Sequence, residues 1–346
     1  MQNTAAVLTA LNTIEMRPVP MPALKAGEVM IKLAAVGICG SDIHYDTHGR
    51  IGDFVVKFPF ILGHEASGTV VETADGVSNL KVGDRVCIEP GVPCGKCEFC
   101  MTGHYNLCPD VVFLATPPYD GCLMNYIAYP AGWTYKLPDN MGFDEGALVE
   151  PLAIGLNAAK TGKVGLGDTV LVYGAGCIGL VSAMAAKAFG ATRVIVVDLI
   201  EKRLEVARQY GALTLNTEKD DVDKQIAALT QGKGVDVVLD CVGLSKTIRG
   251  AVLNARPGAR IVIVGMAADE ISGVPLGPIS TKELVLTSIF RYANLFPATI
   301  AAIAGGAIDV KGIVSNRYPF AQTARAYKET VENIRDTVKS IIVFDG

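Results

Sequence analysis

The spacing of hydrophobic positions changes along the chain and divides it into three segments. In the first 155 residues, short apolar or alternating runs lie between glycine-rich loops, which predicts an irregular, mostly β unit. The clearest of these runs are residues 29–36 and 66–72. After residue 293, a helical stretch, a loop, another helix and a final apolar run over residues 341–344 follow, and periodicity alone does not show where they pack.

Between residues 156 and 292, apolar runs typical of buried strands alternate with helical patterns. The expected strands are Thr169–Tyr173, Arg193–Asp198, Leu213–Asn216, Val235–Asp240, Arg260–Val264 and Leu284–Ser288. Strands separated by helices predict an α/β fold with a parallel, doubly wound sheet of six strands. The apolar run over residues 170–186 contains three glycines and is shorter than the ~20 residues of a membrane span, so we expect a strand, a turn and a helix there.

Composition narrows the class of protein. The 346 residues suffice for about two domains, and 50% hydrophobic and 19% charged residues are typical of a globular protein. A net charge of −4 argues against nucleic acid or an anionic membrane as the main partner. Because the N-terminus carries no recognisable secretory signal, we expect a cytoplasmic protein whose cysteines bind metal or act in catalysis.

A glycine motif follows the first strand of the middle segment. The stretch "VLVYGAGCIG" fits G-x-G-x-x-G at Gly174, Gly176 and Gly179, the spacing that lets a pyrophosphate approach the backbone at a helix N-terminus. Asp198 ends the next strand, where its carboxylate can bind both ribose hydroxyls and would repel a 2′-phosphate, so we expect NAD. Arg203 could stack on adenine or instead accept that phosphate. A glycine turn in an ordinary α/β protein is the plainer alternative.

Two short motifs of the first segment carry residues that bind metals. "GICGSDIHY" contains Cys39, and "GHEASG" contains His64 and Glu65. A thiolate, an imidazole and a carboxylate can hold zinc and leave a fourth position for substrate or water. The alternative is a buried thiol and a core histidine without a metal.

Four of the nine cysteines lie in "PCGKCEFCMTGHYNLC", where Cys94, Cys97, Cys100 and Cys108 follow C-x₂-C-x₂-C-x₇-C. Four thiolates leave zinc no open position, so this site would stabilise a loop-rich lobe at about residues 90–110. An iron–sulfur cluster is the chemical rival. A thioredoxin-like pair fits less well because four thiols exceed its need.

In this order, the motifs resemble those of the zinc-dependent medium-chain alcohol dehydrogenases, most closely the sorbitol/xylitol (polyol) dehydrogenase branch. The resemblance covers essentially the whole chain and includes "GRIGDFVVKFPFILGHEASGTV", "ATPPYDG", "EGALVEPLAIGLNAA" and "FRYAN". It implies a GroES-like catalytic domain over residues 1–155, an inserted NAD-binding Rossmann domain over residues 156–292 and a return to the catalytic domain over residues 293–346. The active site would lie in the cleft between the domains.

The resemblance also implies roles for single residues. Cys39, His64 and Glu65 would bind the catalytic zinc, with Glu150 nearby. Which glutamate binds directly stays open, but we favour Glu65, because one thiolate and one carboxylate bring the charge of Zn²⁺ to zero. The expected substrate contacts are Tyr45, Glu150, Arg291 and Tyr292. The expected cofactor contacts are Gly174, Gly176, Cys177, Ile178, Gly179, Asp198, Arg203, Val264, Gly265, Met266, Ile289, Phe290 and Arg291.

The implied reaction is the oxidation of a polyol to a ketose, with hydride passing to NAD. The proton would leave through Ser41 and His44, or through water and Glu150. Related enzymes for threonine, butanediol or a polyol phosphate are alternatives, although no basic cluster beyond Arg291 suits a phosphate. A non-catalytic NAD(H)-binding structural or sensing protein is a further alternative, but it would be expected to have lost metal ligands that are all present here. We expect a homo-oligomer, with a tetramer favoured over a dimer.

Overall fold

The computed structural model describes residues 2–266 and 270–345 and divides into two compact units. Unit 1 comprises Met1–Glu150 and Phe296–Gly346, and unit 2 comprises Pro151–Leu295. The segment borders expected from the sequence, at residues 155/156 and 292/293, lie a few residues from these bounds.

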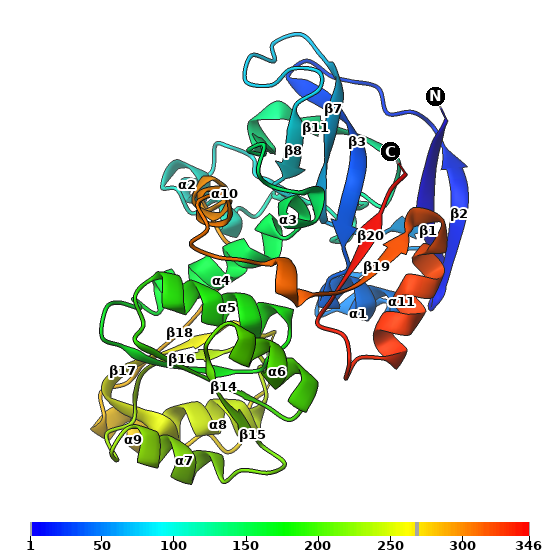
Figure 1. Ribbon diagram of the computed structural model, residues 1–346. Coiled ribbons are helices and arrows are strands. Elements are labelled where there is room, and N and C mark those ends of the chain that lie inside the picture. The colour runs from blue at the N-terminus through cyan, green and yellow to red at the C-terminus, as the bar shows by residue number, and fades with distance from the viewer. Residues whose placement is uncertain (1, 267–269, 346) are drawn as a thin grey trace. The chain divides into compact units, whose positions relative to one another are not determined.

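Unit 1 is built around a sheet that combines strands from both ends of the chain (Figure 1). The strand order is β12-β8-β7-β3-β20-β19, and β11 also pairs with β3. Its strands are β3 (Glu28–Gly37), β7 (Glu65–Thr73), β8 (Arg85–Ile88), β11 (Tyr126–Pro130), β12 (Thr134–Lys136), β19 (Val314–Pro319) and β20 (Lys339–Val343). The final apolar run of the sequence therefore forms β20, which pairs antiparallel with β3 through Ile341 and Gly37.

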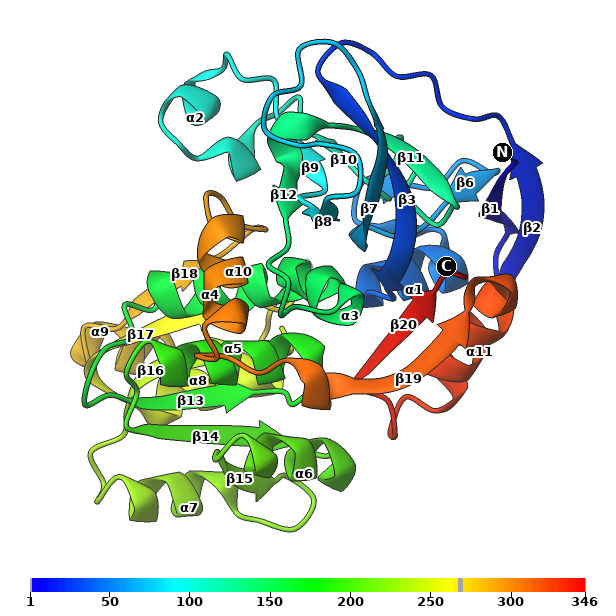
Figure 2. The same ribbon diagram turned by 45° about the horizontal axis from the view of Figure 1, so that its top comes forward.

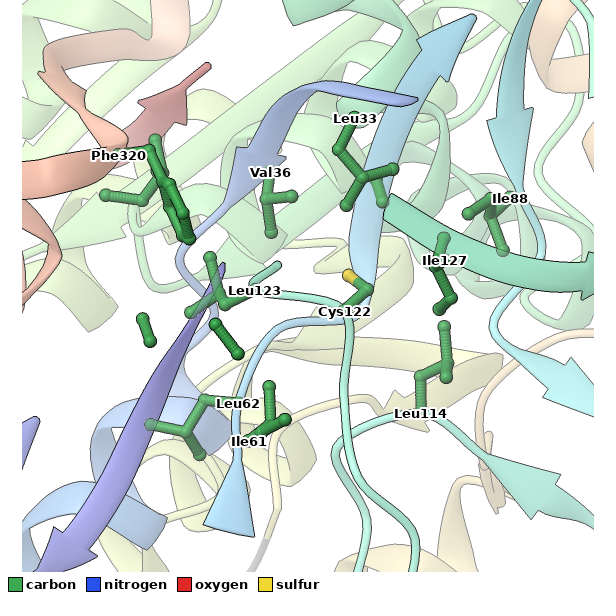
Figure 3. Packing of buried hydrophobic residues seen from close by; sticks show 14 of the residues in the cluster. Leu33, Val36, Ile61, Leu62, Ile88, Leu114, Cys122, Leu123, Ile127 and Phe320 are labelled. Carbon is green, nitrogen blue, oxygen red and sulfur yellow. The ribbon is translucent and has the colours of Figure 1, made fainter. Parts of the chain in front are cut away.

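Smaller sheets complete the β structure of unit 1. They contain β1 (Asn3–Ala10), β2 (Thr13–Val19) and β6 (Phe60–Ile61), β4 (Arg50–Ile51) and β5 (Phe54–Val55), and β9 (Gly91–Val92) and β10 (Val112–Phe113). Figure 3 shows the core that these strands share, where Val36, Leu62, Leu123 and Phe320 come from distant parts of the chain. Burying each such large side chain contributes about 1.5–3 kcal/mol, so the tail is held by the same core as the N-terminal strands.

Short helices of unit 1 connect these strands. They are α1 (Gly40–His48), α2 (Glu98–Met101), α3 (Phe143–Ala147), α10 (Phe296–Ala304) and α11 (Thr323–Glu332), with 3₁₀ turns at Tyr105–Leu107, Ala131–Trp133, Lys311–Ile313 and Phe320–Gln322. Helix α4 (Val149–Thr161) begins at the end of unit 1 and continues into unit 2.

Unit 2 is a doubly wound parallel sheet, as the alternating pattern predicted. Its order is β15-β14-β13-β16-β17-β18, and every pairing is parallel. The strands are β13 (Thr169–Tyr173), β14 (Arg193–Asp198), β15 (Leu213–Asn216), β16 (Val235–Asp240), β17 (Ala255–Ile263) and β18 (Val285–Ser288). The helices are α5 (Cys177–Ala188), α6 (Glu201–Gln209), α7 (Val222–Leu229), α8 (Ser245–Asn254) and α9 (Leu276–Thr281). Helices α5 and α6 cover one face and α7, α8 and α9 the other (Figures 1 and 2).

Two local features refine the prediction for this unit. Strand β17 begins at Ala255, five residues before the predicted start at Arg260. Residues 256–258 are exposed and have no apolar pattern, so the sequence did not indicate this part of the strand. The apolar run over residues 170–186 divides into β13, a glycine turn and α5, as expected. In the described part of the chain, no helix is both long and apolar enough to cross a bilayer.

Candidate active site and metal centres

Helix α1 places Cys39 and Asp42 at its N-terminus. Cys39 is the N-cap residue, and its N–H donates a hydrogen bond to Asp42 Oδ2 at 3.2 Å. Asp42 Oδ1 accepts the N–H of Gly63, the residue before His64, at 3.1 Å. A single fully buried carboxylate therefore joins the two backbone segments that carry Cys39 and His64.

His64 is buried between this carboxylate and an aromatic ring. Its Nδ1 lies 3.6 Å from Asp42 Oδ1, and its ring centroid lies 5.8 Å from that of Phe113. Burial disfavours the imidazolium, but the negative charges of Asp42 and Cys39 outweigh this effect and raise the pKa of His64 well above its usual value. Because Asp42 lies on the Nδ1 side, Nε2 is the nitrogen suited to bind a metal.

Glu65 opens β7 and is fully buried. One of its carboxylate oxygens, a ring nitrogen of His64 and the sulfur of Cys39 all lie within 4.8 Å of one another. This set of a thiolate, an imidazole and a carboxylate fits a zinc ion with three protein ligands and one open position.

A buried lysine from the C-terminal strand also contacts this cluster. Lys339 Nζ lies 2.6 Å from Glu65 Oε1 and 2.5 Å from Oε2. It also donates to the carbonyl of Ile38, the residue before Cys39, at 3.0 Å. Glu65 therefore has a cationic neighbour that belongs to the protein itself.

The other residues expected near the zinc lie at different depths. Glu150 is buried in the first turn of α4. It is not part of the group formed by Cys39, His64 and Glu65, as found among the described residues. Ser41 is half-buried and His44 is exposed on α1. Tyr45, an expected substrate contact, is only 3% exposed and packs edge-on against Phe60 in the hydrophobic core.

Cys94, Cys97, Cys100 and Cys108 surround one point in a separate lobe. All four sulfurs lie within 4.8 Å of one another, with Cys97 Sγ 3.4 Å and Cys94 Sγ 3.9 Å from Cys100 Sγ. Backbone N–H groups of Lys96 and Cys97 lower the pKa of Cys94 to about 7, which favours a thiolate. Four sulfurs at this spacing fit a tetrahedral zinc ion with no position left for substrate.

The glycine motif forms the turn between β13 and α5. Gly174 has a φ of +94°, in the left-handed region that favours glycine. A Cβ on Gly179 would lie 1.8 Å from the Gly174 carbonyl oxygen, so any side chain there would push the helix away from the turn. Gly176 is the N-cap of α5, and Cys177 and Ile178 form its first turn. Their N–H groups are suited to bind a pyrophosphate.

Asp198 ends β14 beside this turn. Its Oδ2 accepts the N–H of Ala175 at 2.6 Å, and its Oδ1 accepts the N–H of Ile200 at 2.8 Å. A Cβ added to Gly176 would lie 3.8 Å from Nη1 of Arg203, so the guanidinium of Arg203 lies next to the glycine turn. Burial lowers the pKa of Arg203, against the opposing charge of Asp198. These residues line a cavity of about 760 Å³ that has the size of a nucleotide site.

Further expected cofactor contacts follow the C-terminal end of β17. The N–H groups of Val264 and Gly265 both donate to the Asp240 carbonyl, at 2.8 and 2.9 Å. Met266 is exposed and is the last residue described before the gap at 267–269. The backbone of this segment is therefore anchored on β16.

The "FRYAN" segment follows β18. The N–H of Ile289 continues the pairing with β17 at 3.1 Å, and Phe290 is half-exposed. The guanidinium of Arg291 lies 4.7 Å from the Phe290 ring centroid. Arg291 has a φ of +56°, and its carbonyl accepts a hydrogen bond from Asn157 Nδ2 at 2.8 Å. Tyr292 is buried.

Comparison with known proteins agrees with these features. Residues 25–139 match the family model "Alcohol dehydrogenase GroES-like domain", and residues 177–305 match "Zinc-binding dehydrogenase". The sorbitol dehydrogenase of Bacillus subtilis is 41% identical over 98% of this chain and 96% of its own length. An Agrobacterium fabrum protein provisionally described as a D-xylulose reductase is 45% identical over 91% of this chain and 90% of its own length.

A solved structure agrees over the whole length. An Escherichia coli oxidoreductase of unknown specificity is 42% identical and superposes with a TM-score of 0.96, covering 100% of both chains. The chain belongs to the zinc-binding dehydrogenases. The predicted zinc- and NAD-dependent dehydrogenase, its GroES-like domain and its Rossmann sheet are confirmed, and the relatives place this zinc-binding dehydrogenase in the polyol branch.

Three residues that support the site of this dehydrogenase were not predicted from the sequence. Asp42 supports both Cys39 and His64, and its position three residues after the N-cap was a usable signal. Lys339 is a charged residue at the start of an apolar strand, which is unusual for a buried position. Asn157 contacts the Arg291 backbone only because of tertiary structure, and no sequence pattern indicated this contact.

Proposed function

We propose that this protein oxidises a polyol of the sorbitol or xylitol type to the corresponding ketose, with NAD as the hydride acceptor. The observation that carries the proposal is the buried group of Cys39, His64 and Glu65, whose ligand atoms lie within 4.8 Å of one another. Relatives named sorbitol dehydrogenase and D-xylulose reductase support the substrate class.

Cys39, His64 and Glu65 would hold the catalytic zinc. When bound, zinc supplies a Lewis acid that lowers the pKa of a substrate hydroxyl. Asp42 would fix the orientation of His64, so that the imidazole keeps Nε2 directed at the metal. Glu150, which is buried but outside the ligand group, would act near the substrate rather than as the direct ligand.

The proton released by the substrate hydroxyl needs a route to solvent. Ser41 and His44 lie on the first turns of α1, directly after Cys39, and His44 is exposed. This order favours a relay from hydroxyl to imidazole to water, with a relay through Glu150 as the rival. Tyr45, Arg291 and Tyr292 remain the proposed polyol contacts.

NAD would bind to the glycine turn of unit 2 and provide the hydride acceptor. The carboxylate of Asp198 would bind the ribose hydroxyls and disfavour a 2′-phosphate, and Arg203 would lie against the adenosine half. Because Asp198 also accepts the N–H groups of Ala175 and Ile200, Asp198→Asn tests the charge with less disturbance than Asp198→Ala.

Turnover with sorbitol, xylitol, threonine and 2,3-butanediol, each with NAD and with NADP, tests the proposal. We expect the polyols with NAD to give the highest kcat/KM, and dialysis against a chelator to abolish turnover until zinc is restored. Turnover with threonine or butanediol alone would overturn the polyol assignment. Activity that survives complete zinc removal would overturn the metal-dependent mechanism.

We also propose that the protein is a homo-oligomer and that it is located in the cytoplasm. Strand β18 is an edge strand of its sheet, and Val285 and Leu286 on it are 40% and 37% exposed, which supports association of copies. None of the nine cysteines, all of which the structure describes, forms a disulfide, which supports a reducing compartment. Sedimentation equilibrium, with a tetramer expected, tests the first part.

A further inference from the structure

Lys339 and Glu65 form an ion pair inside unit 1. The side chain of Lys339 is 3% exposed and that of Glu65 is 1% exposed. Lysine is among the side chains least often fully buried, because removing an ammonium from water is costly unless a partner compensates it. A buried lysine placed directly on a proposed zinc ligand therefore needs an explanation.

The C-terminal strand brings this ammonium to its place. Strand β20 lies beside β3 and pairs with it (Figure 1). The N–H of Ile38 donates to the carbonyl of Ser340 at 2.9 Å. Lys339 precedes Ser340, and its Nζ contacts both oxygens of Glu65 and the carbonyl of Ile38. One side chain thus connects the ligand Glu65 to the peptide that leads into the ligand Cys39.

The surroundings hold the Glu65 carboxylate in one place. A Cβ on Gly37 would lie 2.0 Å from Glu65 Oε2, so the carboxylate occupies space that only a glycine leaves open. The ammonium of Lys339 lies 2.6 Å from Oε1 and 2.5 Å from Oε2, so it contacts both oxygens of the carboxylate. The carboxylate is therefore fixed between Lys339 and the space above Gly37, and a metal that binds it must share its oxygens with the ammonium.

We propose that Lys339 is a positioning residue that acts as an internal counter-ion, holding Glu65 in the ligand position before the metal arrives. A buried carboxylate without any cation would be uncompensated and would tend to leave its place, and Lys339 prevents this while the metal is absent. Lys339 also competes with the metal for the carboxylate. Its presence therefore has two effects: it keeps the site preformed without the metal, and it weakens the binding of the metal. This inference rests on the proposed zinc site.

Thermal stability in zinc-free and zinc-loaded buffers tests this role. In Lys339→Met, the zinc-free protein should lose much more stability than the zinc-loaded protein. The zinc-induced rise in Tm should therefore exceed that of the wild type by about 5 °C or more. Apparent zinc affinity from chelator competition should become about tenfold tighter, because the uncompensated carboxylate recruits the metal. Lys339→Arg should restore wild-type behaviour.

Two further variants keep the test decisive. Glu65→Gln combined with Lys339→Met removes both charges, so the zinc-free double variant should regain a Tm near that of the wild type. Arg317→Met is the matched control, because Arg317 also links the tail to the N-terminal segment, through Asp144 at 2.6 Å, but does so at the surface. It should lower the zinc-free and zinc-loaded Tm equally.

Equal losses in both buffers for Lys339→Met would show a purely structural ion pair and overturn the inference. Collapse of the zinc-free double variant would also overturn it, even if the single variant cannot be purified. A failure of the proposed function looks different. In that case Cys39→Ala would leave the zinc content unchanged, whatever the Lys339 variants show.

Discussion

The two cysteine-containing clusters of unit 1 are built in opposite ways. The four cysteines of the lobe lie within fifteen residues of sequence, 94–108, and three of them are only half-buried. The ligand group of Cys39, His64 and Glu65 is assembled from two segments, and most of its side chains are buried. A local cluster needs a metal to hold its loop, whereas the distributed cluster is held by the fold around it.

The attachment of the lobe illustrates this difference. Tyr105, three residues before Cys108, donates to Glu89 Oε1 at 2.6 Å, and its ring lies edge-on to Trp133 at 4.9 Å. Tyr135 donates to the other oxygen of Glu89 at 2.9 Å. The buried carboxylate of Glu89 therefore helps to dock the lobe on the body of unit 1, and the pairing of β9 with β10 closes its base.

The distributed cluster is supported by compensating buried charges instead. Asp42 lies against His64, and Lys339 lies against Glu65, so two of the three ligand side chains have a charged neighbour. Removal of a metal would leave this arrangement paired. We therefore expect loss of metal to affect stability at the lobe and activity at the distributed cluster.

The largest expected effect separates the two clusters by activity. Cys39→Ala should lower kcat/KM by about 10³-fold or more, because the Lewis acid is lost with its ligand. Zinc content should fall by about one ion per chain, and Tm should change little. Cys87→Ala, a buried cysteine outside both clusters, is the control and should keep zinc and turnover. Full zinc content in Cys39→Ala would contradict the assignment.

Removal of a lobe cysteine should give the reverse result. Cys100→Ser should lower Tm by about 10 °C, because the remaining sulfurs no longer close a tetrahedral site. Turnover of the folded protein at 20–25 °C should stay within a few-fold of the wild type. Differential scanning calorimetry and steady-state kinetics on the same sample check this. A loss of turnover as large as that of Cys39→Ala would show that the lobe takes part in catalysis.

A smaller effect should follow from loosening a metal ligand without removing it. Asp42→Asn takes the charge from the neighbour of His64 and should weaken zinc binding about 10- to 100-fold. Chelator competition in zinc-buffered solution measures this change, and the exposed Asp53→Asn serves as the control. Unchanged affinity would mean that Asp42 serves only to cap α1.

The smallest effect concerns the helix that carries Cys39. Burial raises the pKa of Asp46 on α1 from 3.8 to about 6. As the pH rises, the unfolded chain releases this proton at a lower pH than the folded protein does. The native state therefore loses stability between about pH 4 and about pH 6. After allowance for solvent screening, Asp46→Asn should stabilise the protein by about 1 kcal/mol at pH 7.5 and by little at pH 4. An equal gain of Tm at both pH values would rule out this linkage.

Much of the fold could be predicted because its signals are local. The six strands of unit 2 follow from apolar runs of four to six residues, and the glycine turn follows from steric needs within six residues. The exposed stretch 256–258 at the start of β17 was missed, because a strand without apolar side chains leaves no pattern. The packing of Tyr45 against Phe60 also does not follow from its neighbours in sequence, and its role as a polyol contact stays a prediction.

The sequence by itself determined the fold of unit 2, the spacing of the four lobe cysteines and the two motifs that hold Cys39 and His64. Local spacing suffices for these features, because each depends on residues that the backbone keeps close together. Only the tertiary structure decided that Lys339, 274 residues from Glu65, faces that carboxylate. Pairing of β20 with β3 brings them together, and the cost of burying either charge alone makes the two side chains depend on each other.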